Sequence, residues 1–305
     1  MVKAKVLFVD DEEHIVSTLR SLFRNACEVY TATSGAQALE IIQKNSIHVI
    51  VSDQRMPEMA GIELLREVKR LSPNTMRIML TGYADFAAIV SSINEGEIYR
   101  YIYKPWNNKE VLATVNAAAE VALSLAGEPQ HEPPRTFLEN TQTSILVVDD
   151  AAEIHTTIGK IFEGKRKVFS ATNCVQALDI LERENIGVVI SDVFVAKQDI
   201  TQLLKILKDQ HPDMVTVVLT TFNDANMVVG LINNGQIFRY LTKPVHTGQL
   251  RVSIEAALLY HAKCQHQPRL LSRHRVEKAE PSSSPSLTAM IMSRLKSLRG
   301  GVAAR

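Results

Sequence analysis

Five polar side chains stand at the ends of short apolar stretches within the first 104 residues: Asp10, Asp11, Asp53, Thr81 and Lys104. Clustered carboxylates repel one another unless a cation lies between them, and Mg2+ accepts two or three carboxylate oxygens together with water. A carboxylate beside such an ion can attack a phosphoryl group whose charge Mg2+ and the lysine neutralise. In that chemistry Asp53 is the nucleophile, and the Thr81 hydroxyl hydrogen-bonds the acyl phosphate that forms.

Each of these residues alone has an ordinary structural explanation. Asp11 could cap a helix, Asp53 could open a turn, and Thr81 could be a helix cap. The whole set recurs 139 positions later, as Asp149, Asp150, Asp192, Thr220 and Lys243. Because coincidence rarely repeats five positions in register, the shared site is the better interpretation.

The recurrence extends over a complete domain. LFVDDEEHI (7–15) aligns with LVVDDAAEI (146–154), and IYRYIYKP (98–105) aligns with IFRYLTKP (237–244), without insertion or deletion. We therefore predict a duplicated domain of about 120 residues. The predicted boundaries are 1–126 for the first domain, 127–143 for a proline-containing linker, 144–264 for the second domain and 265–305 for a flexible basic tail.

Apolar stretches and helix-period stretches alternate within each copy. In the first copy the strand candidates are 5–9, 28–32, 48–52, 76–80 and 98–103, and residues 61–71 have the apolar spacing of a helix. Strands that are apolar nearly throughout, each followed by a helix, indicate a parallel sheet covered on both faces. This is the doubly wound α/β class, in which function lies at the carboxyl ends of the strands.

Composition limits the remaining classes. Hydrophobic residues make up 46% and charged residues 22% of the chain, as in soluble domains with cores. Three widely spaced cysteines indicate neither a disulfide framework nor a metal site, which favours a reducing cytoplasm. We expect no signal peptide and no transmembrane segment. Residues 265–305 carry eight Lys and Arg against two Asp and Glu.

Four motifs carry a resemblance to a known family: VDDE at 9–12, SDQRMPEMAGIELL at 52–65, LTGYAD at 80–85 and YIYKP at 101–105. Both copies resemble the receiver domain of bacterial two-component response regulators. The resemblance implies a flavodoxin-like fold with strand order 2-1-3-4-5, and Mg2+ as the cofactor. It also implies that Asp10, Asp11 and Asp53 bind the metal, that Asp53 is phosphorylated, and that Tyr101 is the switch residue.

The second copy departs from the motif around its acceptor. Met56-Pro57 becomes Val195-Ala196, Gly61 becomes Ile200, and Gly82 becomes Thr221. The central positions survive, so Asp149, Asp150 and Asp192 are the expected metal ligands, and Tyr240 is the expected switch residue. Two interpretations stay open, one in which Asp192 is phosphorylated and one in which the second copy is a degenerate docking domain.

An aspartyl-nucleophile phosphatase is the competing enzymatic class. Such enzymes carry a general acid two residues after the nucleophile, and this chain has Arg55 and Phe194 there. We therefore expect self-phosphorylation and autodephosphorylation only. The expected function is a phosphorelay response regulator that signals through its receiver surface, around the fourth helix, fifth strand and fifth helix, with a phosphate sink as an alternative.

The expected partners are a sensor histidine kinase or phosphotransfer protein and a downstream effector protein. About 40 residues follow the second copy, too few for a helix-turn-helix module with a linker, so we do not expect direct DNA binding. In the tail, Leu287, Ile291 and Leu298 recur at helical spacing. We predict either a solvated tail or a helix that docks on an acidic partner or membrane surface.

Overall fold

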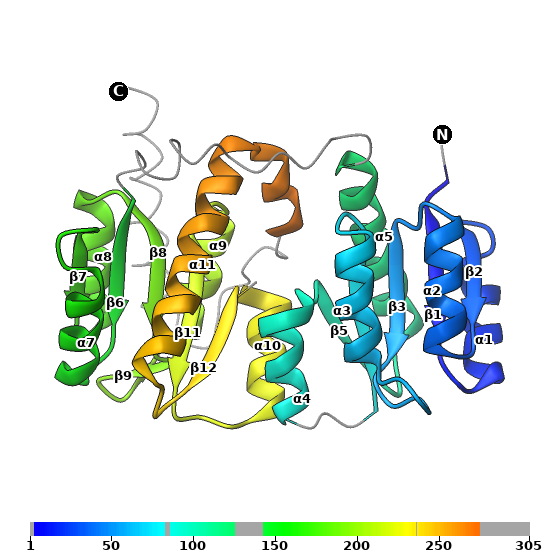
Figure 1. Cartoon of the computed structure of the whole chain (residues 1–305), viewed down its shortest axis with the longest axis horizontal. Coiled ribbons are helices and arrows are strands. Elements are labelled where there is room, and N and C mark those ends of the chain that lie inside the picture. Colours follow the sequence, from blue (N-terminus) through cyan, green and yellow to red (C-terminus); the bar gives the residue numbers. More distant parts are fainter. Residues whose placement is uncertain (1–2, 83–85, 126–142, 236, 275–305) are drawn as a thin grey trace. The chain divides into compact units, whose positions relative to one another are not determined.

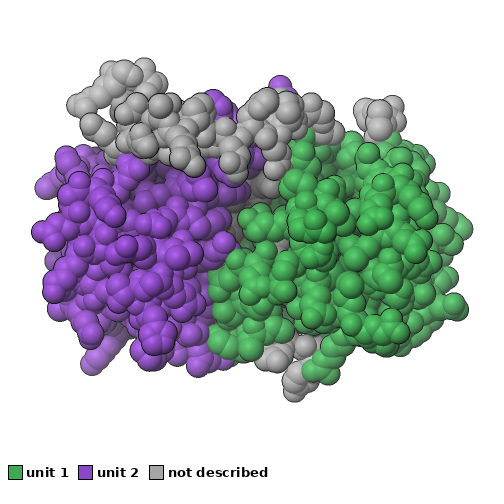
Figure 2. Space-filling view, viewed as in Figure 1, with its two compact units in different colours: residues 1–129, 224–233 green, residues 130–223, 234–305 purple. Residues whose placement is uncertain are grey.

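A computed structural model of the protein describes residues 3–82, 86–125, 143–235 and 237–274. Contacts divide the chain into two compact units, residues 1–129 with 224–233 and residues 130–223 with 234–305 (Figure 2). Each sequence copy contributes one five-stranded sheet. Nearly all of the predicted linker, and the predicted docking helix of the tail, lie outside the described residues.

The first sheet is parallel throughout, with strand order β2-β1-β3-β4-β5. Its strands are β1 (Lys5–Val9), β2 (Glu28–Ala32), β3 (Val49–Asp53), β4 (Met76–Thr81) and β5 (Arg100–Tyr103). Every residue of β3 and β4 is buried, as expected for apolar strands covered on both faces. The predicted fold class and strand order are confirmed.

Helices connect these strands and flank the sheet (Figure 1). In chain order they are α1 (Glu13–Phe23), α2 (Gly35–Lys44), α3 (Gly61–Leu71), α4 (Phe86–Ser91), the π-helical turn η1 (Ser92–Gly96) and α5 (Asn108–Leu125). Helix α1 contacts α5, whereas α2 contacts α3. One pair therefore covers each face, which is why the strands between them carry few polar side chains.

The second copy repeats this architecture with strand order β7-β6-β8-β11-β12. Its parallel strands are β6 (Ser144–Val148), β7 (Val168–Ala171), β8 (Ile186–Ser191), β11 (Val215–Thr220) and β12 (Arg239–Thr242). The helices are α7 (Ala152–Phe162), α8 (Cys174–Arg183), α9 (Thr201–Gln210), α10 (Ala225–Gly235), α11 (Thr247–His266) and the 3-10 helix η2 (Pro268–His274). A short hairpin of β9 (Phe194–Val195) and β10 (Gln198–Asp199) was not predicted.

Two separate apolar clusters form the core of the second copy. Leu146 and Val148 of β6 pack in a cluster with residues of α8 and α9. Ile145 and Val147 of the same strand pack with residues of α7 and α11. Because successive side chains of a strand point to opposite faces, an uninterrupted apolar strand supplies both clusters.

Helix α11 extends beyond the predicted domain end. It continues to His266, and η2 follows it and contacts it. The expectation of a flexible tail from residue 265 onward therefore differs from the structure for residues 265–274. His261 and Cys264 of α11 are buried, so the helix is held by packing up to its last turns.

In the first copy, a buried arginine binds the loop that precedes β4. Arg77 Nη1 donates to the carbonyl of Thr75 at 2.6 Å and to that of Pro73 at 3.3 Å. The second copy has Thr216 at the matching position. A threonine cannot reach both carbonyls with charged donors, so these loop carbonyls need another partner there.

A buried lysine supplies that partner in the second copy. Lys208 of α9 donates to the carbonyl of Pro212 at 2.8 Å and to that of Met214 at 2.7 Å, which are the carbonyls that match Pro73 and Thr75. Only 2% of Lys208 is exposed. Burial lowers the pKa of Lys208 to about 8.

This lowered pKa predicts a pH-dependent stability of the second copy. Between about pH 8 and pH 10.5, unfolded Lys208 holds its proton while folded Lys208 has lost it. The free energy of unfolding should therefore rise with pH across this window and be insensitive to Lys208 below it. Lys208→Met should remove that rise in urea unfolding followed by circular dichroism. Lys69→Met, at the matching and more exposed position, is the control, and identical pH slopes for Lys208→Met and wild type would contradict the prediction.

Candidate functional site

In the first copy one lysine lies between two carboxylates that come from different strands. Lys104 Nζ lies 2.6 Å from Asp10 Oδ2 and 2.6 Å from Asp53 Oδ1. Asp10 follows β1, Asp53 ends β3, and Lys104 follows β5. Because parallel strands end at the same edge of the sheet, Asp10 and Lys104 meet although 94 positions separate them.

Backbone N–H groups hold the second oxygen of each carboxylate. Glu12 N donates to Asp10 Oδ1 at 3.1 Å, and Arg55 N donates to Asp53 Oδ2 at 2.6 Å. Burial raises the pKa of Asp10 against the hydrogen bonds from Lys104 and Glu12 N, and the Asp53 charge raises it further. Burial alone would lower the pKa of Lys104, but its hydrogen bonds to both carboxylates raise it. Lys104 thus stays charged, and its one ammonium group lies between the carboxylates of Asp10 and Asp53.

Thr81 and Asp11 complete the predicted set. Thr81 ends β4 and is only 2% exposed. Asp11 is exposed, and the described residues provide no hydrogen bond or ion pair to its carboxylate. No group of three or more His, Cys, Asp and Glu side chains among the described residues is arranged for a metal ion. In donor chemistry Asp10, Asp11 and Asp53 suit Mg2+, because all their ligand atoms are carboxylate oxygens.

The loop between β3 and α3 passes close to the Asp53 backbone. Gly61 N donates to the carbonyl of Gln54 at 3.0 Å. A Cβ atom at position 61 would lie 2.0 Å from the carbonyl oxygen of Asp53, which no side chain can tolerate. Glycine at this position therefore lets α3 begin directly beside the acceptor strand.

We predict that Gly61→Ala destabilises the first copy by at least about 2 kcal/mol, because the methyl group forces the loop away from Asp53. Gly82→Ala is the matched control, since among the described residues its Cβ would meet only Lys104 Cβ, at 3.8 Å. Urea unfolding followed by the fluorescence of Trp106, the single tryptophan, measures both. Equal unfolding midpoints for the two variants would show that the close approach does not constrain the loop.

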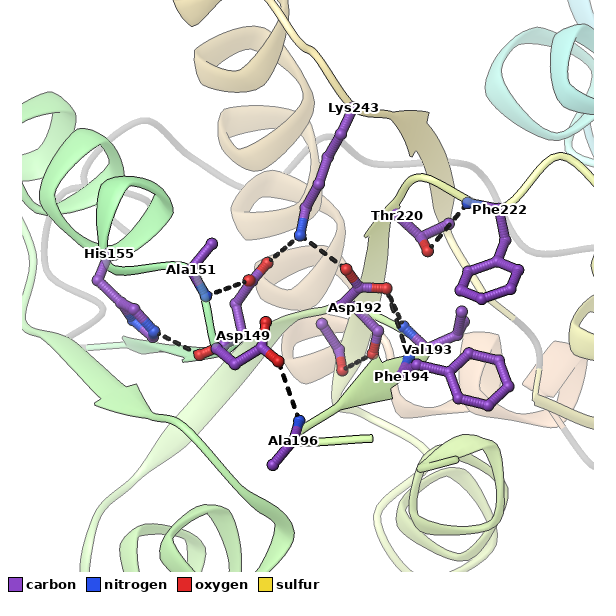
Figure 3. A network of polar contacts seen from close by, with 12 residues as sticks. Asp149, Ala151, His155, Asp192, Val193, Phe194, Ala196, Thr220, Phe222 and Lys243 are labelled. Carbon is purple, nitrogen blue, oxygen red and sulfur yellow. Dashed lines mark hydrogen bonds and ion pairs between the residues drawn. The ribbon is translucent and has the colours of Figure 1, made fainter. Parts of the chain in front are cut away.

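The second copy has the same lysine bridge (Figure 3). Lys243 Nζ lies 2.6 Å from Asp149 Oδ2 and 2.7 Å from Asp192 Oδ2. Ala151 N donates to Asp149 Oδ1 at 2.9 Å, and Val193 N donates to Asp192 Oδ1 at 2.7 Å. Burial would lower the pKa of Lys243, but its hydrogen bonds to Asp149 and Asp192 raise it.

The loop after Asp192 differs from its counterpart in the first copy. Ile200 N keeps the matching bond, to the carbonyl of Val193 at 3.0 Å, but the preceding residues form the β9–β10 hairpin. Its turn residues Ala196 and Lys197 have φ values of 51° and 62°. Each left-handed residue other than glycine costs about 1 kcal/mol. Ala196 N also donates to Asp150 Oδ2, at 3.1 Å.

Sequence reasoning missed three side chains beside the second site. His155 Nε2 donates to the carbonyl of Asp149 at 2.7 Å, and the rings of Phe194 and Phe222 contact at a centroid distance of 4.6 Å. Figure 3 shows these three residues around the acidic pair. A comparison of the two copies at position 155 could have found the histidine, because the first copy has Val16 there.

The two predicted switch tyrosines are buried, with different partners. The Tyr101 hydroxyl is hydrogen-bonded to Ser92 Oγ of η1, and burial raises the pKa of Tyr101. The Tyr240 hydroxyl donates to the carbonyl of Phe222 at 2.6 Å. In the second copy the tyrosine is therefore tied to the backbone that follows Thr220, whereas in the first it is tied to the helical segment after α4.

Comparison with known protein families identifies the type of domain that carries this site. The family described as the response regulator receiver domain matches residues 6–116 and residues 145–255. The chain belongs to this family. It is a tandem pair of receiver domains, the phosphorelay module of two-component response regulators.

Curated relatives match either less than half of this chain or about two thirds of it. The hydrogenase transcriptional regulatory protein HoxA of Cupriavidus necator is 38% identical over 126 residues, 41% of this chain and 26% of HoxA. The transcriptional regulatory protein HptR of Staphylococcus aureus is 24% identical over 221 residues, 68% of this chain and 84% of HptR. This chain spans about a quarter of the length of the two HoxA proteins it matches.

Solved structures align with single receivers. The signal receiver domain of an HD domain-containing protein from Pseudomonas fluorescens is 34% identical and covers 41% of this chain and 92% of its own, with a TM-score of 0.39. A response regulator receiver domain protein from Clostridium thermocellum is 33% identical and covers 38% and 94%, with a TM-score of 0.36. Among the described residues, none of the helices has both the length and the apolar character that a membrane crossing needs.

Proposed function

We propose that this response regulator accepts a phosphoryl group on Asp53, with Mg2+ held by Asp10, Asp11 and Asp53. The observation that supports this most directly is the Lys104 ammonium 2.6 Å from both Asp10 and Asp53. The ammonium lies where the oxygens of a phosphoryl group on Asp53 would come, beside the atom that attacks. A bound Mg2+ would supply a second positive charge to those oxygens.

In the proposed reaction an Asp53 oxygen forms a bond to phosphorus while the bond from phosphorus to the donor's leaving group breaks. Lys104 shifts from the Asp53 carboxylate to an oxygen of the transferred group, and stabilises its charge. The buried Thr81 hydroxyl then hydrogen-bonds another of those oxygens. Asp10 continues to accept the Lys104 hydrogen bond, which keeps the ammonium group oriented.

Turnover of outside phosphate esters is not proposed, because protonation of a poor leaving group needs a general acid beside the nucleophile. Position 55 holds an arginine and position 194 a phenylalanine. Arg55 contributes its backbone N–H to Asp53, and Phe194 contacts Phe222. Neither side chain can donate a proton to a leaving alkoxide at neutral pH.

We predict that a small acyl phosphate donor with Mg2+ labels the chain mainly at Asp53 and that Asp53→Asn removes most of the label. Mass spectrometry of the labelled peptide, with hydroxylamine sensitivity as the sign of an acyl phosphate, measures this. Ser52→Ala is a neighbouring control, because the Ser52 hydroxyl donates to the Asp53 carbonyl at 2.9 Å rather than to its carboxylate. Full labelling of another residue in the Asp53→Asn variant would contradict the assignment of Asp53 as the acceptor.

We infer that the two receivers accept phosphate unequally, with Asp192 the slower acceptor. The lysine bridge from Lys243 supports acceptance at Asp192, whereas the loop after Asp192 is a hairpin that lacks the Met56-Pro57 and Gly61 of the first receiver. Asp192→Asn should reduce total labelling by less than Asp53→Asn does. Phosphopeptide ratios from time courses on both variants measure the rates, and equal rates at the two acceptors would refute the inequality.

The proposed output is a change of receiver surface that a partner protein reads. In the first receiver, movement of Thr81 toward a phosphoryl group alters the space beside Tyr101, whose hydroxyl binds Ser92. Tyr240 would respond in the second receiver. A sensor histidine kinase or phosphotransfer protein is the proposed donor, and an effector protein the proposed target.

A further inference from the structure

The turn of the β9–β10 hairpin holds two consecutive residues in a backbone conformation that L-amino acids rarely adopt. Ala196 has a φ of 51° and Lys197 a φ of 62°. A two-residue turn with both φ values positive is of type I′, which favours Asn-Gly. Two antiparallel residue pairs flank the turn, and so short a ribbon is not stable by itself. Another contact must therefore help to hold the turn.

That contact is made to a carboxylate of the acidic site. Ala196 N donates to Asp150 Oδ2 at 3.1 Å, and Figure 3 shows Ala196 at the end of this bond. The Asp150 side chain is exposed, so the hairpin reaches it at the rim of the site. The hydrogen bond joins the strained turn to one of the two acids that follow β6.

The first receiver cannot make this bond. Its matching residue is Pro57, which has no N–H and whose ring fixes φ near about −65°, outside the left-handed region. The carboxylate of Asp11, which matches Asp150, accordingly has no hydrogen bond among the described residues. The second receiver, with alanine where the first has proline, thus has a backbone donor directed at Asp150.

We propose that the Ala196 N–H is an internal competitor for the cation at Asp150, so that Mg2+ binds the second receiver more weakly than the first and opens the β9–β10 turn when it binds. This inference rests on the Mg2+ ligand role proposed above. The Ala196 N–H and a cation that coordinates Asp150 Oδ2 would compete for one oxygen atom, so each would weaken the binding of the other. Loss of the bond leaves the left-handed turn without a main support.

Two contacts connect the β9–β10 turn to the switch residue Tyr240. Phe194 of β9 contacts the ring of Phe222 at 4.6 Å, and the carbonyl of Phe222 accepts the Tyr240 hydroxyl at 2.6 Å. A cation that displaces the Ala196 N–H from Asp150 would therefore change the packing of Phe194 against Phe222. In this receiver metal occupancy, before any phosphoryl transfer, alters the surroundings of Tyr240.

Two substitutions should shift Mg2+ affinity in opposite directions. Ala196→Pro restores the first receiver's residue and removes the donor, so the Kd of the second site for Mg2+ should fall about ten-fold, the effect of one hydrogen bond to a charged acceptor. The double variant Ala196→Asn, Lys197→Gly makes the preferred turn pair, stabilises the closed hairpin, and should raise Kd about three-fold. Calorimetric titration of full-length chains with MgCl2, in a background carrying Asp10→Asn and Asp11→Asn, isolates the second site.

Amide exchange gives a second readout in the wild-type chain. At constant ionic strength, saturating MgCl2 should speed exchange of the Ala196 amide and of residues 194–199. An Ala196 amide equally protected with and without Mg2+, or an unchanged Kd in the Asn-Gly variant, would overturn the proposal even if Ala196→Pro fails to fold. Absence of any Mg2+ binding to the second site would also overturn it. Labelling at Asp53 of the wild-type chain tests the proposed function separately, because Asp53 lies in the other receiver.

Discussion

An ammonium group shared by two buried carboxylates is the interaction on which each receiver depends. Asp10 is 1% exposed and Asp53 5% exposed, and two such charges without a counter-ion would each cost several kcal/mol to bury. Lys104 compensates both only because β1, β3 and β5 end at one level of the sheet. The register of the strands and the charge balance of the site therefore constrain each other, and any slip of β5 would leave two uncompensated acids.

Outside that site, the two receivers meet the same backbone requirement with different side chains. The loop carbonyls before β4 are bound by Arg77, and those before β11 by Lys208. His48 accepts a hydrogen bond from Lys5 N in the first copy, whereas the second has Gly187 at that position. A Cβ at Gly187 would lie 2.5 Å from His261 Nε2, so the missing side chain makes room for a histidine of α11. Buried carbonyls must be paired, but the fold leaves open which element supplies the donor.

The segment that follows the acceptor aspartate also differs between the receivers. In the first, Pro57 has no N–H to donate, and the carboxylate of Asp11 accepts no hydrogen bond from the described residues. In the second, a hairpin follows Asp192, its Phe194 contacts Phe222, and Ala196 N of its turn donates to Asp150. A duplicated receiver can thus keep its charge arrangement while the surrounding loop changes how a cation or phosphoryl group reaches it. The proposed division is one responsive receiver and one whose response depends on its hairpin.

The sequence by itself determined the strands and the convergence of their ends. The predicted strands 5–9 and 28–32 coincide with β1 and β2. Buried β1 leaves a nearly continuous apolar signal, whereas the edge strand β2, in which only Ala32 is buried, is recognised by its β-branched and aromatic residues. The same logic brought Asp10, Asp53 and Lys104 to one edge, since a parallel sheet admits no other arrangement of its carboxyl ends. Their roles in phosphoryl transfer and Mg2+ binding remain predictions from residue type and family.

Only the tertiary structure decided the features that depend on contacts between distant segments. Nothing in the pattern at 194–199 indicates a hairpin, because two-residue strands have no periodicity and Ala-Lys is a poor sequence for a type I′ turn. The partners of Tyr101 and Tyr240 were equally hidden, since identical motif positions bind Ser92 in one copy and the Phe222 carbonyl in the other. Local sequence encodes which residues are buried, whereas hydrogen-bond partners depend on which donors the packed elements bring within reach.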